Sequence, residues 1–218
     1  MFKLSKKIAV VTGASRGIGK SMAITYAKAG AHVVCVSRTQ DALKTVADAI
    51  NADGGSASVS TCDVSDFNAF QNLIKATTDT HGSVDILVNN AGLAVGLSPI
   101  HSGLIDDWER MIDTNIKGLL YITRKISPIM AGQKTGHIIN IGSIAAKETY
   151  ANGNAYCATK HAVDSLSKAM RIDLLEYGIK VTAIHPGMVD TEFSLVRFKG
   201  DKQAANKVYD GMTPLFAN

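Results

Sequence analysis

Short runs of β-branched and apolar residues recur along the chain and alternate with stretches that have the spacing of amphipathic helices. The runs lie at residues 8–11, 32–36, 58–62, 85–88, 137–141 and 180–184. Strands separated by helices predict βαβ units, and right-handed crossovers place the helices on both faces of a parallel sheet. Such sheets bind ligands in the crevice at the carboxyl ends of their strands. The pattern predicts an α/β fold with a doubly wound parallel sheet.

The composition fits one domain of this kind. The chain has 218 residues, of which 46% are hydrophobic, and this content suffices for one large core. Neither a repeat, a low-complexity segment nor a linker divides the sequence, so we expect a single domain over residues 1–218. The net charge of +4 is dispersed rather than clustered with aromatic residues, which argues against a nucleic-acid partner.

Features of the termini and the cysteines bear on location. No apolar run approaches the roughly 20 residues of a membrane span, and Lys3, Lys6 and Lys7 precede a strand-length run rather than a signal peptide. The three cysteines are odd in number and lack the spacing of metal ligands. We therefore expect a cytoplasmic protein with reduced thiols, no metal and no membrane partner.

A glycine-rich turn follows the first predicted strand. Gly13, Gly17 and Gly19 lie in Thr-Gly-Ala-Ser-Arg-Gly-Ile-Gly, ahead of a helical stretch that reaches Ala29. Three such glycines allow a sharp turn, close approach of backbone N–H groups to a pyrophosphate, and tight packing of the helix on the strand. An ordinary turn needs only one glycine. The spacing favours a dinucleotide-binding domain of the Rossmann type.

Tyr156 and Lys160 form a second pattern, in Asn-Ala-Tyr-Cys-Ala-Thr-Lys, and Ser143 precedes them by thirteen residues. On a helix, residues four apart lie on one face, which brings the ammonium near the phenol. A nearby cation favours the phenolate and lowers the phenol pKa, so tyrosine becomes a better acid and base at neutral pH. Alone, a Tyr-x-x-x-Lys pattern is weak evidence for catalysis. The glycine turn strengthens it, because it predicts a dinucleotide site in the same chain.

Together these motifs resemble the short-chain dehydrogenases/reductases over nearly the whole chain. The resemblance rests on the glycine turn, Asn89-Asn90-Ala91-Gly92, Asn115, Ser143, Tyr156, Lys160 and Pro186-Gly187. Segments 90–96, 108–115, 136–143 and 192–201 are similar to one group of that family, the NADP-dependent 3-hydroxy acid dehydrogenases, also described as serine 3-dehydrogenases. The resemblance implies hydride transfer between NADP and a small 3-hydroxy or 3-oxo acid, such as serine, allo-threonine or a 3-hydroxyisobutyrate-like compound.

The resemblance also assigns a cofactor site. At the end of the second strand a carboxylate would bind the ribose of NAD, whereas this chain has Arg38 and Thr39 there. Arg38 and Arg16 could hold the 2′-phosphate of NADP through charge-assisted hydrogen bonds. Asp63 would flank the adenine, although it also begins a turn that could cap a helix from Asp66. The implied cofactor residues are Gly13, Ser15, Arg16, Gly17, Ile18, Gly19, Arg38, Thr39, Asp63, Val64, Asn90, Gly92, Tyr156, Lys160, Pro186, Gly187, Val189 and Thr191.

Four residues carry the catalysis that the resemblance implies. Tyr156 would exchange a proton with the substrate oxygen, and the Ser143 hydroxyl would donate a hydrogen bond to the same oxygen. Lys160 would lower the Tyr156 pKa and hydrogen-bond the nicotinamide ribose. Asn115 would hold a water that links Lys160 to solvent.

The substrate would be bound by Ser143, Tyr156 and a loop over about residues 188–207. Arg197 and Lys199 in this loop are candidates to bind a substrate carboxylate, and the alternative is that both are solvated charges on a mobile loop. The loop is where the family places substrate recognition.

The end of the chain departs from the family pattern. Residues 213–218 resemble the start of a further helix, which relatives follow with a seventh strand, and that final strand is missing here. We therefore expect the natural protein to be longer. We also expect a homo-oligomer, either a dimer or a tetramer, that uses the helices after Thr114 and Asn154.

Two other functions stay open. One is a 3-oxoacyl-[acyl-carrier-protein] reductase or a broad carbonyl reductase of the same family, in which Arg171 could contact an acidic carrier. The other is a non-catalytic module that senses NADP. The segment at 192–201 favours the small acid over the first, and the full set of catalytic residues argues against the second.

Overall fold

The computed structural model describes residues 3–208 and 215–216. Six strands form one sheet, and each lies within two residues of the run that predicted it. They are β1 Ile8–Thr12, β2 His32–Ser37, β3 Ser56–Thr61, β4 Ile86–Asn89, β5 Gly136–Ile141 and β6 Ile179–Ile184. Their order is β3-β2-β1-β4-β5-β6, and every neighbouring pair is parallel. The predicted doubly wound sheet is confirmed.

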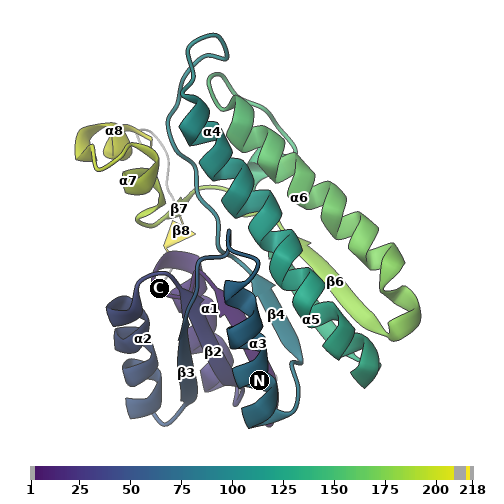
Figure 1. The fold of residues 1–218 in the computed structure, drawn as a ribbon. Coiled ribbons are helices and arrows are strands. Elements are labelled where there is room, and N and C mark those ends of the chain that lie inside the picture. Colours follow the sequence, from purple (N-terminus) through teal and green to yellow (C-terminus); the bar gives the residue numbers. More distant parts are fainter. Residues whose placement is uncertain (1–2, 209–214, 217–218) are drawn as a thin grey trace.

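Helices cover both faces of this sheet (Figure 1). The larger ones are α1 Gly17–Lys28, α2 Gln40–Ala52, α3 Ala69–His81, α4 Ile105–Ile112, α5 Leu119–Gln133 and α6 Asn154–Asp173. A π-helix, η1 Asp113–Gly118, joins α4 to α5, and two 3-10 turns are η2 Ile144–Ala146 and η3 Leu175–Tyr177. Figure 1 shows α4 and α5 end to end in one long helical run, with α6 beside it on the β6 side of the sheet.

Alternation along the strands divides the core between the two faces. Val10, Val34 and Leu87 are buried with side chains of α3, α5 and α6. Ala9 and Val33 point the other way and are buried with side chains of α1 and α2. Because successive strand residues face opposite sides, the continuous apolar runs supply both cores at once.

The segment after β6 lies outside these layers, beyond the carboxyl ends of the strands (Figure 1). It contains β7 Val189–Asp190, α7 Phe193–Arg197, α8 Lys202–Lys207 and β8 Leu215–Phe216, and β7 pairs with β8 in a separate two-stranded sheet. In the described part of the chain, no helix is both long enough and apolar enough to span a membrane.

Two predicted elements differ in the structure. The helix expected from Asp66 begins at Ala69 because the Asp66 carboxylate accepts hydrogen bonds from the backbone N–H groups of Asn68 and Ala69, which form a turn instead. The helix expected after Thr213 is wrong at Leu215–Phe216, which form strand β8, and the other residues of 213–218 lie outside the described ones.

Candidate active site

The glycine turn between β1 and α1 forms one wall of the crevice. Gly13 and Gly17 have φ values of 65° and 52°, in the left-handed region that favours glycine. A Cβ at Gly19 would collide with the Gly13 carbonyl oxygen and the Asn90 side-chain amide. The three glycines of the motif are therefore required by the backbone itself.

The N-terminus of α1 faces the same crevice. Arg16 is the N-cap residue, and its side chain makes no capping hydrogen bond; the first turn of α1 contains no acidic residue. Uncapped N–H groups and the positive end of the helix dipole form a site for an anion. Ser15 and Ile18 lie in this turn with the glycines.

Asn90 braces the glycine turn. Its Nδ2 donates to the carbonyl oxygens of Thr12 and Gly13, at 2.9 Å and 3.2 Å. The Thr12 hydroxyl accepts from the backbone N–H groups of Asn90 and Ala91. These hydrogen bonds join the end of β4 to the glycine turn, and the place of Asn90 beside a nicotinamide ribose stays a prediction.

A charged groove lies at the ends of β2 and β3. Arg38 Nη1 is 4.0 Å from Asp63 Oδ2, and both side chains are about half exposed. The Asp63 Oδ1 atom accepts from the N–H and hydroxyl of Ser65, which is the turn role that the sequence left open. The groove has a volume of about 290 Å³ and is lined by Arg38, Asp63, Ser65, Asp106, Glu109, Arg110, Asp113 and Thr114. The sequence pattern did not predict that α4 lines this groove, although residues 106–113 are rich in charged side chains.

The structure brings Ser143, Tyr156 and Lys160 together where β5 ends and α6 begins. The Ser143 hydroxyl hydrogen-bonds the Tyr156 phenol and also accepts from the Ala145 N–H at 3.1 Å. Lys160 Nζ donates to the Ile141 carbonyl oxygen at 2.9 Å and lies 5.9 Å from the centre of the Tyr156 ring. Both α6 side chains are buried, as expected for one face of a helix.

Burial sets the charge of these two groups. It raises the pKa of Tyr156 to about 12, and the Ser143 hydrogen bond offsets only part of that rise. Burial also lowers the pKa of Lys160 to about 8. The sequence predicted a lowered Tyr156 pKa from the neighbouring ammonium; the opposite direction arises because loss of solvent outweighs the favourable partners. Tyr156 is thus a neutral phenol here, which is a proton donor.

Asn115 lies in the π-helix η1 and is buried. Its Oδ1 accepts from the Leu93 N–H at 2.9 Å, and its Nδ2 donates to the Leu93 carbonyl at 2.8 Å and the Thr159 hydroxyl at 3.0 Å. A π-helical turn inside a longer helix is typical of functional sites. Asn115 therefore joins the loop after β4 to α6 beside Lys160. A Cβ on Gly92 would lie 3.2 Å from Asn115 Oδ1 and 3.5 Å from Lys160 Nζ.

The turn after β6 reaches back to the glycine turn. The Pro186 carbonyl accepts from the Ile144 N–H at 2.9 Å, which ties this turn to the Ser143 loop. The Thr191 methyl group lies 3.3 Å from the position that a Cβ on Gly17 would take. Gly187 and Val189 lie between these two contacts. The turn after β6 therefore lies against both the Ser143 loop and the glycine turn.

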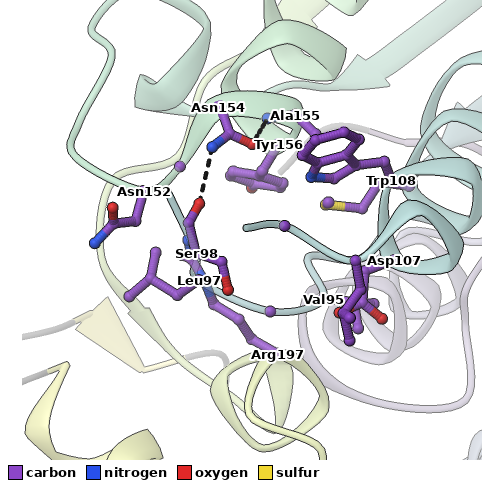
Figure 2. Close-up of a pocket in the computed structure, with 15 residues that line it drawn as sticks. Val95, Leu97, Ser98, Asp107, Trp108, Asn152, Asn154, Ala155, Tyr156 and Arg197 are labelled. Atoms are coloured by element: carbon purple, nitrogen blue, oxygen red, sulfur yellow. Dashed lines mark hydrogen bonds between the residues drawn. The ribbon is translucent and has the colours of Figure 1, made fainter. Parts of the chain in front are cut away.

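A small pocket adjoins Tyr156 (Figure 2). Val95 and Leu97 from the loop after β4, Trp108 from α4 and Asn154 from the start of α6 surround it, and Asn154 Nδ2 donates to the Ser98 carbonyl at 2.9 Å. The cavity volume is about 10 Å³, about one water molecule. α7 closes it from the side of the substrate loop.

Arg197 of α7 projects into this pocket (Figure 2). It is only 9% exposed, and its Nε and Nη2 atoms are buried with no hydrogen-bond partner among the described residues. Its guanidinium lies 5.3 Å from the Tyr150 ring and 5.7 Å from the Tyr156 ring, and hydrogen-bonds the Tyr150 hydroxyl. Tyr150 was missed because no spacing rule links it to residue 197.

Lys199, the other basic candidate, has a partner within the protein. Its ammonium lies 3.0 Å from the Asp107 carboxylate of α4. The two candidates are thereby separated: Arg197 faces the pocket with free donors, and Lys199 joins the substrate loop to α4.

The fold and this site define a class. A doubly wound parallel sheet carries a glycine turn for a dinucleotide, and a serine, a tyrosine and a lysine meet at the carboxyl ends of its strands. Such an arrangement belongs to oxidoreductases that use a nicotinamide dinucleotide.

Comparison with known proteins gives the family. The sequence profile described as short chain dehydrogenase matches residues 7–201. The chain is 43% identical over 209 residues to the NADP-dependent 3-hydroxy acid dehydrogenase YdfG of Salmonella typhi, covering 95% of this chain and 83% of that protein. It is 39% identical over 210 residues to serine 3-dehydrogenase of Agrobacterium fabrum, covering 96% and 82%. The chain belongs to the short-chain dehydrogenase family.

A solved structure is similar throughout. The closed form of serine dehydrogenase complexed with NADP+ matches with a TM-score of 0.92 and 42% identity, over 96% of this chain and 84% of that one. The chain is accordingly an oxidoreductase of the family.

Proposed function

We propose that this protein is an NADP-dependent oxidoreductase that interconverts small 3-hydroxy acids and their 3-oxo acids. The observation that carries the proposal is the buried Arg197 guanidinium beside Tyr156, with two donors free. A substrate with a carboxylate near its reacting carbon would satisfy those donors. Relatives named 3-hydroxy acid dehydrogenase and serine 3-dehydrogenase support the same substrate class.

The residues present fit an NADP cofactor. α1 begins with no capping side chain and no acidic residue in its first turn, so its first backbone N–H groups are open to a diphosphate. Arg16 and Arg38 supply cations for the 2′-phosphate, with no carboxylate at residues 37–39. Gly187 and Thr191 would hold the nicotinamide end. When bound, the cofactor accepts or supplies the hydride.

The protein's own residues move the proton. Ser143 donates a hydrogen bond to the substrate oxygen and fixes it beside the Tyr156 phenol. As the neutral phenol, Tyr156 delivers a proton to that oxygen in reduction; in oxidation its deprotonated form takes the proton from the substrate hydroxyl. Lys160 provides a nearby cation. Asn115 joins Leu93 to Thr159 beside Lys160 and would hold a water on the route from Lys160 to solvent.

Arg197 binds the carboxylate. A buried guanidinium with unmet donors costs free energy, and a carboxylate matches its planar fork with two parallel charge-assisted hydrogen bonds. The guanidinium lies 5.3 Å from the centre of the Tyr150 ring and 5.7 Å from that of the Tyr156 ring, and these cation–π contacts help to hold it in place. This geometry holds the substrate by its acid group while its hydroxyl reaches Ser143 and Tyr156.

The pocket argues against a carrier-bound substrate. Its volume of about 10 Å³ is about that of one water molecule, so a tethered acyl chain would need a larger opening of the loop than a small acid. Arg171, the residue considered for an acidic carrier, donates from Nε and Nη2 to the Val181 carbonyl oxygen instead. Both observations favour the small acid over the 3-oxoacyl-[acyl-carrier-protein] reductase.

We further propose a cytoplasmic homo-oligomer. Cys35, Cys62 and Cys157 are all free and buried, which suits a reducing compartment. Large apolar side chains stay exposed on the helices expected to pair, including Leu120 of α5 at 38% and Ile172 of α6 at 77%. Light scattering on the purified protein would test the assembly, and a monomer would contradict it.

The substrate class is tested by NADPH formation with a panel of compounds. L-Serine, L-allo-threonine, 3-hydroxyisobutyrate and 3-hydroxypropionate form the acid set, and secondary alcohols of similar size without a carboxylate form the neutral set. We expect activity confined to the acids. Equal activity on the neutral set would move the assignment to a broad carbonyl reductase.

A further inference from the structure

A charged cluster lies behind the Ser143 loop, outside the substrate pocket. His185 is the last residue before Pro186, and its ring lies between two elements of the active site. Its Nδ1 is 3.1 Å from the Ser143 carbonyl oxygen, and its Nε2 is 3.1 Å from Asp164 Oδ1. Asp164 is on α6, one turn after Lys160 and two turns after Tyr156.

The partners of His185 fix its protonation. A carbonyl oxygen can only accept, so Nδ1 must donate to Ser143. Lys168 at 2.8 Å and Lys147 at 2.9 Å hold the pKa of the Asp164 carboxyl well below its usual range, so this carboxylate also only accepts. A neutral imidazole donates from one nitrogen alone. Both contacts together require a ring with a proton on each nitrogen.

The charges around the ring are compatible with that cation. Asp164 of α6 contacts the ring through Oδ1, and Lys168 of α6 and Lys147 of the loop after Ser143 contact the other oxygen of the same carboxylate. The Asp164 side chain is 13% exposed, whereas the two lysines are 45% and 64% exposed and are screened by water. The carboxylate is therefore the strongest charge felt by His185.

We propose that His185, as an imidazolium held by Asp164, is a positioning residue that fixes Ser143 relative to Tyr156. The ring ties the Ser143 carbonyl to the helix that carries Tyr156. Backbone hydrogen bonds hold the residues on either side of Ser143: Gly142 N–H donates to the Ile184 carbonyl at 2.7 Å, and Ile144 N–H donates to the Pro186 carbonyl. The Ser143 carbonyl itself is held by the His185 ring. Gly142 has no space for a Cβ because the His185 ring fills it.

The inference concerns the proton-transfer geometry of the proposed function and is independent of the choice of substrate acid. Ser143 must place its hydroxyl near both the phenol and the substrate oxygen. A displacement of about 1 Å in such a group can cost about a hundredfold in rate. A clamp on its main chain is a direct way to prevent that displacement.

The first test is spectroscopic and needs no substrate. Long-range ¹H–¹⁵N correlation spectra of the whole protein at neutral pH distinguish a doubly protonated imidazole from either neutral tautomer. The chain has six histidines, so the His185 signals are assigned as those missing in His185→Gln. We expect both nitrogens of His185 to be protonated. A neutral tautomer would overturn the proposal.

The second test is a double-mutant cycle with any compound that the enzyme turns over. His185→Phe, which keeps the ring volume without donors, should lower kcat about tenfold to a hundredfold and change the dissociation constant of NADPH by less than about twofold. His185→Gln should recover part of the loss, and Asp164→Asn should act in the same direction. His161→Gln, an exposed histidine on the same helix, is the matched control and should change nothing.

The cycle uses Ser143→Ala as its second substitution. If His185 acts through Ser143, His185→Phe should have less than about a twofold effect in the Ser143→Ala background. Additive losses, or an unchanged kcat in both His185→Phe and Asp164→Asn, would overturn the proposal. If the substrate panel shows no activity while the spectra show a doubly protonated ring, the proposed function fails. The proposed link of His185 to Ser143 and Asp164 is then still supported by the spectra.

Discussion

Tyr156 and Lys160 lie on the same buried face of α6, yet burial moves their pKa values in opposite directions, to about 12 and about 8. Both shifts favour the neutral form of the side chain. The motif spacing predicted that the two residues meet, because helix geometry is local. It did not predict the direction of the Tyr156 shift, because depth of burial depends on Arg197, Phe193 and the pocket walls, which are distant in sequence.

Tyr156→Phe tests the proton transfer. The variant keeps the ring and its packing, so NADPH binding should stay within about twofold, while kcat falls by at least about a thousandfold because the proton donor is lost. Fluorescence titration with NADPH and steady-state kinetics check the two parts. A kcat within tenfold of the wild type would exclude Tyr156 as the proton donor.

Lys160→Met tests the cost of the buried ammonium. The folded pKa of about 8 lies below the unfolded value of 10.5, so between these pH values the unfolded chain binds more protons and the free energy of unfolding rises with pH. Below pH 8 the wild type bears the full cost, on the order of 3 kcal/mol, partly offset by the bond to Ile141.

At pH 7 we therefore expect Lys160→Met to be more stable than the wild type by about 2 kcal/mol in urea unfolding of the cofactor-free protein. The advantage should shrink as the pH rises from 8 to 10.5. A difference that stays constant across this range would contradict the buried charge as its cause.

At the scale of elements, the local sequence pattern predicted the strands. It did not predict the π-helix η1 or the pairing of β7 with β8, which depend on contacts between distant segments. β-branched runs specify strands, and all six appear. The sequence pattern around Asn115 predicts an ordinary helix, whereas the structure has the π-helix η1 there. The Asn115 side chain bonds to Leu93 and Thr159, and no local pattern contains these contacts. Strand β8 likewise depends on β7, more than twenty residues earlier.

Two helical glycines, one in the glycine turn and one in α5, provide a matched pair of substitutions. Gly19→Ala should weaken NADP binding by at least about tenfold and destabilise the fold, because its Cβ collides with the Gly13 carbonyl and the Asn90 amide. Gly132→Ala in α5 has nothing within 4 Å of its Cβ and should stabilise the protein by about 0.5 to 1 kcal/mol. Thermal unfolding and cofactor titration compare the two. Equal effects of both would refute the steric argument.

At the scale of the whole molecule, the parallel sheet gathers the site from segments that span most of the chain. The carboxyl ends of β1, β4, β5 and β6 deliver the glycine turn, Asn90, Ser143 and Pro186 to one crevice. This much followed from the alternation of strands and helices. The position of the substrate loop did not, because it is set by two long-range contacts, the Lys199–Asp107 ion pair and the bond from Gly96 N–H to the Arg197 carbonyl.

Lys199→Gln tests how the loop is held. A half-exposed ion pair contributes about 1 kcal/mol or less, so the loop should open more often without losing its fold. We expect faster hydrogen exchange in α7 and α8, a KM for the acid raised about two- to fivefold, and little change in kcat. Lys75→Gln, which removes an exposed pair on α3, is the control. Unchanged exchange in α7 would contradict the role of this ion pair.

The central claim is that Arg197 recognises a carboxylate beside Tyr156. The direct measurement is kcat/KM of the wild type and of Arg197→Met for a 3-hydroxy acid and for its neutral amide. The wild type should prefer the acid by about a hundredfold, since a buried bidentate pair contributes a few kcal/mol. Arg197→Met should lose that preference and keep its activity on the amide within about threefold. An acid preference that survives in Arg197→Met would contradict the account.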